Sequence, residues 1–236
     1  MTRTVAHRGF RALAPENTVR AARRAVRDHD PAAVEVDVRP TADGDPVCHH
    51  DARLDGTTDR RGLVRETPTE AVCSARVAGT DATVPRLSAV LDALAPDTTA
   101  VVEAKVDGLG EDDRAAFRDR VLGLTADAPL TVVHQSFDDR WVRAVAARST
   151  APVAVLARED ATAALEVARE VGARAVHLAW PLVERAVSGG DGPTPDAVHD
   201  AGLACWAWTV ADRDVAATLA AAGVDALTVD DPAVVV

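Results

Sequence analysis

The chain has 236 residues and a formal net charge of −11, from 37 acidic and 26 basic side chains. A chain of this length can bury a core as a single domain, so we expect one domain over residues 1–236. The spread negative charge disfavours nucleic-acid and anionic-lipid partners, and no apolar run approaches the roughly 18 residues of a membrane span.

The cysteines and the N-terminus favour a cytoplasmic location. Cys48, Cys73 and Cys205 are odd in number and lack C-x-x-C spacing, which argues against a disulfide framework and a structural zinc site. A strand-like segment begins at once, which leaves no room for a signal peptide. The acidic composition with a single lysine resembles that of proteins from salt-loving (halophilic) organisms.

Eight strand-like segments alternate with amphipathic segments along the chain. The strands are expected at residues 3–7, 32–38, 99–105, 130–134, 152–156, 174–178, 204–210 and 226–229. Helices are expected at residues 18–28, 86–94, 112–122, 139–147, 161–171, 194–201 and 212–222, the first capped by Asn17. This alternation predicts an α/β fold, a (β/α)8 TIM barrel.

Two connections depart from this alternation. Residues 46–50 are strand-like but follow Asp37 too closely for a crossover helix, so they predict a small hairpin insertion after the second strand, turning at residues 42–45. Residues 188–195 contain three glycines and two prolines, which predicts a flexible loop.

Charged residues stand at predicted strand ends, where barrel enzymes carry their active sites. His7, Asp37 and Lys105 lie at such ends, and alternation places Glu35 beside Asp37 and Glu103 beside Lys105 on inward faces. Inward charges are costly unless they are paired or bind a metal ion, and three carboxylates suit Mg²⁺ or Ca²⁺. Each carboxylate taken alone is equally consistent with an arginine pair at the rim.

Two histidines and two cations join these carboxylates. His7-Arg8 and His49-His50 follow strand-like stretches, and Lys105 is the only lysine beside 25 arginines. A retained lysine suggests a task that arginine cannot perform. Together the groups indicate a metal-assisted site for a phosphate ester, although Arg8 alone could be a surface cation and Lys105 a partner of Glu103.

A series of short motifs resembles the glycerophosphodiester phosphodiesterase family of phosphatidylinositol-phospholipase-C-like barrels, in the family's order and nearly end to end. The motifs are Ala6-His7-Arg8-Gly9, Pro15-Glu16-Asn17-Thr18, Glu35-Val36-Asp37-Val38, Thr41-Ala42-Asp43-Gly44, Val47-Cys48-His49-His50-Asp51, Val84-Pro85-Arg86-Leu87, Glu103-Ala104-Lys105, Gln135-Ser136-Phe137, Trp208-Thr209-Val210, Gly223-Val224-Asp225 and Asp230-Asp231-Pro232.

The resemblance implies a metal-dependent hydrolase of lipid metabolism that converts glycerophosphodiesters to glycerol phosphate and an alcohol. It implies that His7 and His50 form the acid/base pair and that Glu35, Asp37 and Glu103 bind a divalent metal ion, Mg²⁺ or Ca²⁺. The substrate's neighbouring hydroxyl would attack to give a cyclic phosphate, and direct attack by water remains an alternative.

The resemblance also implies substrate contacts. Arg8 and Lys105 would hold the phosphate, and Trp208 would pack against the organic part of the substrate or serve as an ordinary core aromatic. Glu16 could orient Arg8 or the first histidine, or simply begin a helix, and Asp51 favours the second histidine of its pair as the active one.

The chain departs from the family pattern at Gly56, Ala211, Ala226 and Val229, all outside the charged constellation, which leaves substrate preference open. A phospholipase or another lipid-headgroup phosphodiesterase is an alternative within the same class. In a different class, Lys105 could form the Schiff base of a barrel aldolase. A barrel that binds phosphodiesters without turnover is a third alternative, and the oligomeric state is open.

Overall fold

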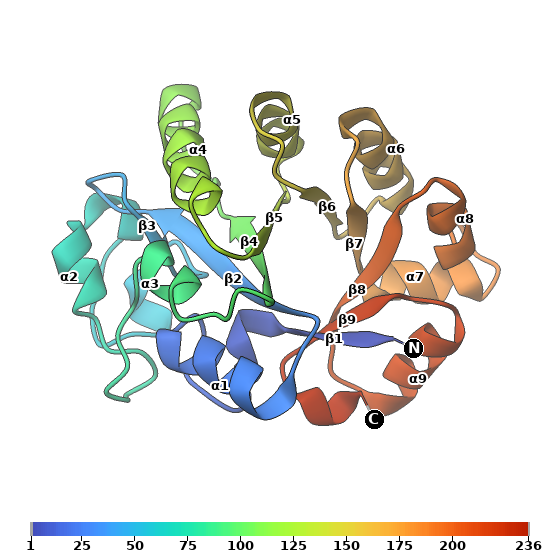
Figure 1. Ribbon diagram of the computed structural model, residues 1–236, viewed down its shortest axis with the longest axis horizontal. Coiled ribbons are helices and arrows are strands. Elements are labelled where there is room, and N and C mark those ends of the chain that lie inside the picture. The colour runs from blue at the N-terminus through green and yellow to red at the C-terminus, as the bar shows by residue number, and fades with distance from the viewer. Residues whose placement is uncertain (1, 236) are drawn as a thin grey trace.

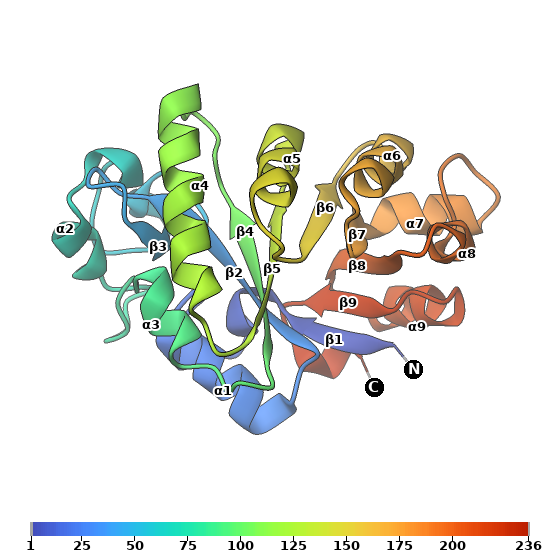
Figure 2. The ribbon, with the colours of Figure 1, turned by 45° about the horizontal axis from the view of Figure 1, so that its top comes forward.

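The computed structural model describes residues 2–235 and contains a closed ring of parallel strands (Figure 1). The strands are β1 (Arg3–Ala6), β2 (Ala33–Pro40), β3 (Pro46–Cys48), β4 (Thr99–Ala104), β5 (Thr131–Ser136), β6 (Val153–Ala157), β7 (Ala175–Ala179), β8 (Ala204–Val210) and β9 (Ala226–Val229). β1 pairs with both β2 and β9, side by side with β9 in Figure 2, and so closes a ring of eight strands. The predicted TIM barrel is confirmed.

Helices cover the outside of the ring, as Figures 1 and 2 show. They are α1 (Val19–His29), α2 (Thr69–Cys73), α3 (Leu87–Leu91), α4 (Glu111–Ala126), α5 (Asp139–Arg148), α6 (Ala161–Val171), α7 (Trp180–Val187), α8 (Pro195–Asp200) and α9 (Arg213–Ala221). Within residues 2–235, none of these helices has the length and apolar character to cross a bilayer.

The strand register fills the inside of the ring with small apolar side chains. The innermost cluster consists of Val5, Ala33, Val101, Val133, Ala154, Ala175 and Ala226. Side chains alternate along a strand, so the residue two positions after each of these also points inward, nearer the carboxyl ends. Six of those seven residues are polar, namely His7, Glu35, Glu103, Gln135, His177 and Thr228. The barrel is therefore apolar at its base and polar toward the carboxyl ends of its strands.

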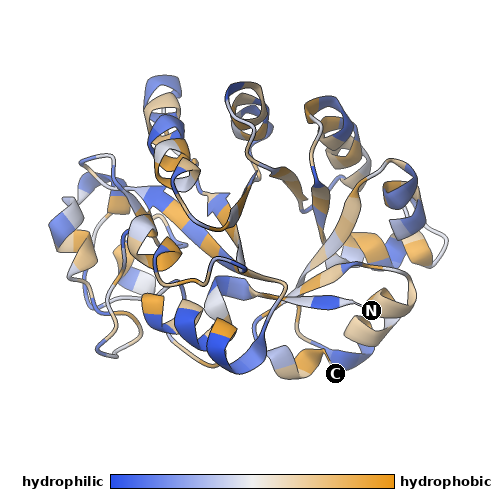
Figure 3. Ribbon diagram, viewed as in Figure 1, coloured by the Kyte–Doolittle hydropathy of each residue, from blue (hydrophilic) through white to orange (hydrophobic). Residues whose placement is uncertain are grey.

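β2 shows how one strand serves both purposes. Val34, Val36 and Val38 belong to the large core between ring and helices, whereas Glu35 and Asp37 face inward and are also buried. Figure 3 shows this alternation of hydrophobic and hydrophilic residues along β2. The period of two thus places the carboxylates inside without breaking the outer core.

Side-chain caps fix several helix starts. Asp138, Asp160 and Asp212 each accept a hydrogen bond from a backbone N–H in the first turn of α5, α6 and α9. The predicted cap of the first helix was wrong by one residue, because Thr18 caps α1 by accepting from the Ala21 N–H. Asn17 adopts a left-handed conformation, with φ of 55°, and turns its side chain toward the strands.

The predicted hairpin insertion is confirmed and carries a small core of its own. β3 runs antiparallel to β2 outside the ring, and Gly44 takes the positive φ of 78° that its turn requires. Residues 47–84 enclose a hydrophobic cluster separate from the barrel core, which we call the satellite core. Its members are Val47, Leu54, Val64, Val72, Ala75, Val77 and Val84.

Helices α2 and α7 were not predicted. α7 follows β7 without an intervening loop, and Pro181 stands in its first turn, where proline needs no N–H partner. The predicted strand at residues 174–178 matches β7, and the helix that follows it was missed. Residues 188–194 form the predicted loop between α7 and α8, with positive φ at Gly189 and Gly192.

Candidate active site

Three carboxylates from neighbouring strands meet inside the carboxyl end of the barrel. Glu35 and Asp37 come from β2, and Glu103 comes from β4, where it is the register partner of Asp37. One carboxylate oxygen from each lies within 4.8 Å of the other two, and all three residues are buried. Parallel pairing and alternation thus bring together the predicted metal ligands.

The charges of this carboxylate triad are mutually destabilising. Burial raises the pKa of Glu35 well above its usual value, and the charges of Asp37 and Glu103 raise it further. Burial and Asp37 likewise raise the pKa of Glu103 to about 7. Burial opposes ionisation of Asp37 as well, but Lys105 and Arg8 outweigh it and hold the Asp37 pKa below its usual range. The positive charges of Arg8 and Lys105 therefore do not fully balance the three carboxylates.

Arg8 lies beside the triad because the chain turns sharply after β1. His7–Gly9 form a short 3₁₀ turn in which Arg8 has a left-handed φ of 51°. The Arg8 amide donates to Glu35 Oε2 at 2.9 Å, and its guanidinium contacts Asp37 at 3.1 Å and Glu16 at 2.9 Å. Glu16 therefore contacts Arg8, as one of the two sequence interpretations expected.

Lys105 follows β4 and places its ammonium between two members of the triad. Lys105 Nζ lies 3.1 Å from Asp37 Oδ1 and also pairs with Glu103. Burial alone would lower the Lys105 pKa, but the charges of Asp37 and Glu103 reverse the effect and raise it. The chain's single lysine is thus a charged group in the barrel mouth.

His7 is oriented by a carboxylate from the far end of the chain. His7 Nδ1 lies 2.5 Å from Asp230 Oδ1, and Asp230 also contacts Arg11 Nε at 2.8 Å. The other ring nitrogen, His7 Nε2, lies 4.0 Å from Glu35 Oε2. His7 therefore turns its free nitrogen toward the triad.

His49 and His50 occupy different environments. His49 is buried, and its nitrogens contact the Asp51 carbonyl at 2.8 Å and Thr57 Oγ1 at 3.0 Å. The His50 side chain is 34% exposed, and its Nδ1 lies 2.7 Å from Asp51 Oδ1. Burial lowers the His50 pKa, opposed by the nearby charge of Asp37. His50 is thus the more accessible of the two histidines, and it is also the one that the sequence favoured.

Two residues of this constellation were given no part in the site from the sequence. Asn17 donates its amide to Asp37 Oδ2 at 2.9 Å and accepts from the Asp37 N–H at 3.0 Å. Asp230 lies against His7, although the two are 223 positions apart. Both residues stand in the motifs on which the family resemblance rests. Those motifs were the sequence signal that could have identified them.

Trp208 borders a small cavity of about 30 Å³ below the mouth, together with His7, Glu35, Glu103 and His177. Trp208 Nε1 donates to the His177 carbonyl at 2.9 Å. This volume suits about one water molecule. The Trp208 ring lies at the edge of this cavity.

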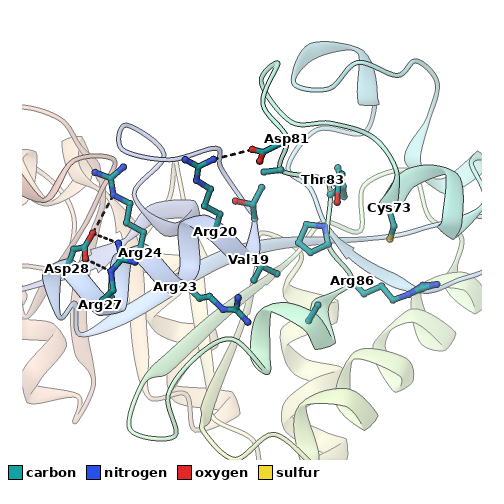
Figure 4. Close-up of a pocket in the computed structure, with 15 residues that line it drawn as sticks. Val19, Arg20, Arg23, Arg24, Arg27, Asp28, Cys73, Asp81, Thr83 and Arg86 are labelled. Atoms are coloured by element: carbon teal, nitrogen blue, oxygen red, sulfur yellow. Dashed lines mark hydrogen bonds and ion pairs between the residues drawn. The ribbon is translucent and has the colours of Figure 1, made fainter.

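A groove of about 960 Å³ lies on the outer flank, between α1 and residues 81–89 (Figure 4). Arginines line it, but Arg20 pairs with Asp81 at 3.2 Å, and Arg24 and Arg27 both contact Asp28. The groove has no histidine, and its charges are largely paired. The chemistry is therefore assigned to the barrel mouth.

Comparison with known proteins finds one family and several of its members. Residues 7–234 match the model of the glycerophosphoryl diester phosphodiesterase family. The putative glycerophosphodiester phosphodiesterase YhdW of Bacillus subtilis is 28% identical over 97% of this chain and 94% of that protein. Bovine glycerophosphodiester phosphodiesterase 1 is 50% identical over 58 residues, which are 25% of this chain and 17% of that protein.

Solved structures share the fold. An Oleispira antarctica phosphodiesterase in complex with the product sn-glycerol-3-phosphate has a TM-score of 0.83 at 22% identity, covering 98% of this chain and 94% of that one. A putative glycerophosphoryl diester phosphodiesterase from Silicibacter pomeroyi has a TM-score of 0.84 at 22% identity, covering 99% of this chain and 91% of that one.

Proposed function

Because the chain belongs to the glycerophosphoryl diester phosphodiesterase family of phosphoric diester hydrolases, we propose that it hydrolyses glycerophosphodiesters to glycerol phosphate and an alcohol. One observation carries the proposal. A buried triad of carboxylates lies beside a histidine whose far nitrogen is held by Asp230. The product bound to the Oleispira antarctica relative supports the same substrate class.

The triad fits a divalent metal ion. Glu35 Oε1 is buried without a hydrogen-bond partner, and the raised pKa values of Glu35 and Glu103 record a deficit of positive charge. Carboxylate oxygens are the donors that Mg²⁺ and Ca²⁺ prefer. We assign Glu35, Asp37 and Glu103 as ligands, and the bound ion would supply charge that stabilises the non-bridging phosphate oxygens.

Arg8 and Lys105 are the proposed phosphate-binding groups. Both cations already contact Asp37, so they balance part of the triad's charge and remain fixed in place. A fixed cation stabilises developing negative charge without reorganising during the reaction. Arg8 is held additionally by Glu16.

His7 and His50 are the proposed acid/base pair. Each Nδ1 contacts a carboxylate, Asp230 for His7 and Asp51 for His50. This contact favours a proton on Nδ1 and leaves Nε2 free to exchange protons with the substrate. One histidine would take the proton of the attacking hydroxyl, and the other would protonate the departing alkoxide. The substrate's neighbouring glycerol hydroxyl is the nucleophile that the family resemblance suggests.

The aldolase alternative receives little support from the geometry. A Schiff-base lysine must become neutral to attack a carbonyl. Lys105 instead lies between Asp37 and Glu103, whose charges raise its pKa. An aldolase would also leave the histidine–carboxylate pairs without a task.

Incubation with glycerophosphodiesters and Mg²⁺ or Ca²⁺, followed by phosphorus NMR, tests the proposed reaction. Glycerol phosphate and free alcohol are the expected products, and a transient cyclic phosphate would indicate attack by the substrate hydroxyl. If no glycerophosphodiester is turned over with any divalent ion, the proposal fails. Borohydride trapping of a carbonyl compound on Lys105 would support the aldolase instead.

We expect Lys105→Arg to lower kcat/KM for a glycerophosphodiester at least about tenfold, although the charge is kept. Lys105 is nearly buried between two carboxylates, and a planar guanidinium cannot take the place of its compact ammonium. Steady-state kinetics of the folded variant measure the effect. Arg118→Lys is the matched control, because Arg118 is buried on α4 and pairs with Asp119. A Lys105→Arg value within twofold of the parent would reduce Lys105 to a structural partner.

We expect Asp230→Asn to lower kcat by about 10- to 100-fold with little change in KM. The amide keeps the size of the side chain but removes the charge that orients His7 and stabilises its protonated form. The pH profile of kcat is the second readout, and it should differ from that of the parent because a charge beside a proton-transfer group has been removed. Asp231→Asn is the control, because Asp231 only caps a C-terminal turn. An unchanged kcat and pH profile would contradict the positioning role.

A further inference from the structure

Two aromatic rings meet at the mouth of the barrel. Phe137 directly follows β5, and Trp208 lies near the end of β8. Their ring centroids are 5.4 Å apart in an edge-to-face arrangement, and Phe137 is 40% exposed. Trp208 also borders the cavity that reaches His7, Glu35 and Glu103. The pair therefore forms an exposed wall beside the proposed reaction centre.

An arginine covers this wall. Arg158 is exposed and follows the end of β6, at the same mouth. Its guanidinium carbon lies 5.1 Å from the Phe137 centroid and 5.6 Å from the Trp208 centroid. Over residues 2–235, no carboxylate comes within ion-pair distance of Arg158, although Glu159 and Asp160 are its neighbours in sequence. The rings hold the guanidinium, and its N–H donors remain available.

This arrangement restricts the alcohol that the wall can accept. Open aromatic faces attract quaternary ammonium groups such as that of choline. Here a cation of the protein already lies against both rings, so a cationic alcohol would meet repulsion where it would otherwise be attracted. A guanidinium fork instead pairs with planar anions through two charge-assisted hydrogen bonds.

We propose that Arg158 makes the enzyme selective for glycerophosphodiesters whose alcohol carries a second anionic group, a carboxylate or a phosphate. The inference rests on the proposed function, because it takes the diester phosphate to bind at the triad. Arg158 would contact the anionic group of the alcohol, while Phe137 and Trp208 hold the guanidinium in place.

The position of Lys105 supports this assignment. Lys105 Nζ lies 5.7 Å from the centroid of the same Phe137 ring. The separation of Lys105 and Arg158 therefore cannot exceed the sum of their distances from that ring. A small diester can span such a distance, with its phosphate near Lys105 and the anionic group of its alcohol near Arg158.

The test uses three diesters of glycerol that differ only in the alcohol: 3-hydroxypropanoate, its uncharged amide 3-hydroxypropanamide, and choline. An equimolar mixture followed by phosphorus NMR gives the ratios of kcat/KM directly. We expect the carboxylate to be preferred over the amide and over choline by about tenfold, the worth of one charge-assisted pair. In Arg158→Gln both ratios should fall to within about twofold, while turnover of the amide is retained.

Arg148→Gln is the matched control, because it removes the same charge from an exposed arginine at the far end of α5. It should keep the parental ratios. If the parent turns over all three diesters without preference, or if Arg158→Gln keeps the parental ratios, the inference is overturned and the proposed function stands. Absence of turnover of all three diesters would overturn both.

Discussion

His7→Ala and His50→Ala are each expected to lower kcat by at least about 100-fold, with the fold intact. Each substitution removes a proton carrier, a contribution of roughly 100- to 10,000-fold, while the triad, Arg8 and Lys105 remain. KM should change less than kcat, because proton transfer is absent from the ground state. Steady-state kinetics and circular dichroism of the purified variants measure both parts of the expectation.

The neighbouring histidine provides the sharpest control. His49 is buried and contacts Thr57 and the Asp51 carbonyl, so His49→Ala should lower the free energy of unfolding by about 2 to 4 kcal/mol. The folded fraction should keep kcat within about tenfold of the parent. His29→Ala and His199→Ala, on the surface, should leave both quantities nearly unchanged. A crippled kcat in His49→Ala with full activity in His50→Ala would reverse the assignment.

Chelation is expected to abolish turnover, and adding back Mg²⁺ or Ca²⁺ should restore it. The ion should also stabilise the fold, because only the folded chain assembles the triad. At a hundredfold excess over Kd the gain is about 2.7 kcal/mol, or a rise of roughly 5 to 10 °C in the unfolding midpoint. Activity assays and thermal scans after exhaustive EDTA treatment measure these effects. Full turnover in EDTA would disprove the metal assignment.

Glu35→Gln separates metal binding from the rest of the site. The variant should be inactive and its unfolding midpoint should no longer respond to the ion. In EDTA it should be at least as stable as the parent, because one of three mutually repelling buried carboxylates is gone. A parental response of its midpoint to the ion would show that Glu35 is not a ligand.

The barrel and the triad were predictable because both follow from short-range rules. Alternation on one strand places Glu35 and Asp37 on the same face, and parallel pairing of β2 with β4 adds Glu103. Eight strands with helices between them admit few other topologies. The distance between triad members follows directly from strand spacing.

The other parts of the site could not be predicted, because they depend on long-range contacts that no local sequence pattern encodes. Asp230 reaches His7 across almost the whole chain, and Asn17 gave up a helix cap for a hydrogen-bonded pair with Asp37. Arg158 is one of many surface arginines of the chain, and only the positions of Phe137 and Trp208 distinguish it. Long-range closure of the ring created these contacts, so sequence periodicity could not reveal them.

The satellite core and the barrel differ in the free energy that is needed to open them. His50 and Asp51 lie in the segment that this small cluster supports, whereas the triad, Arg8 and His7 belong to the ring. Protein substructures open independently, each with its own free energy, and a cluster of seven modest side chains opens more easily than a closed barrel. Warming would therefore release His50 while the ring still held the carboxylate triad, Arg8 and Lys105 in place. The upper temperature for catalysis is then determined by the satellite core, which opens before the barrel itself unfolds.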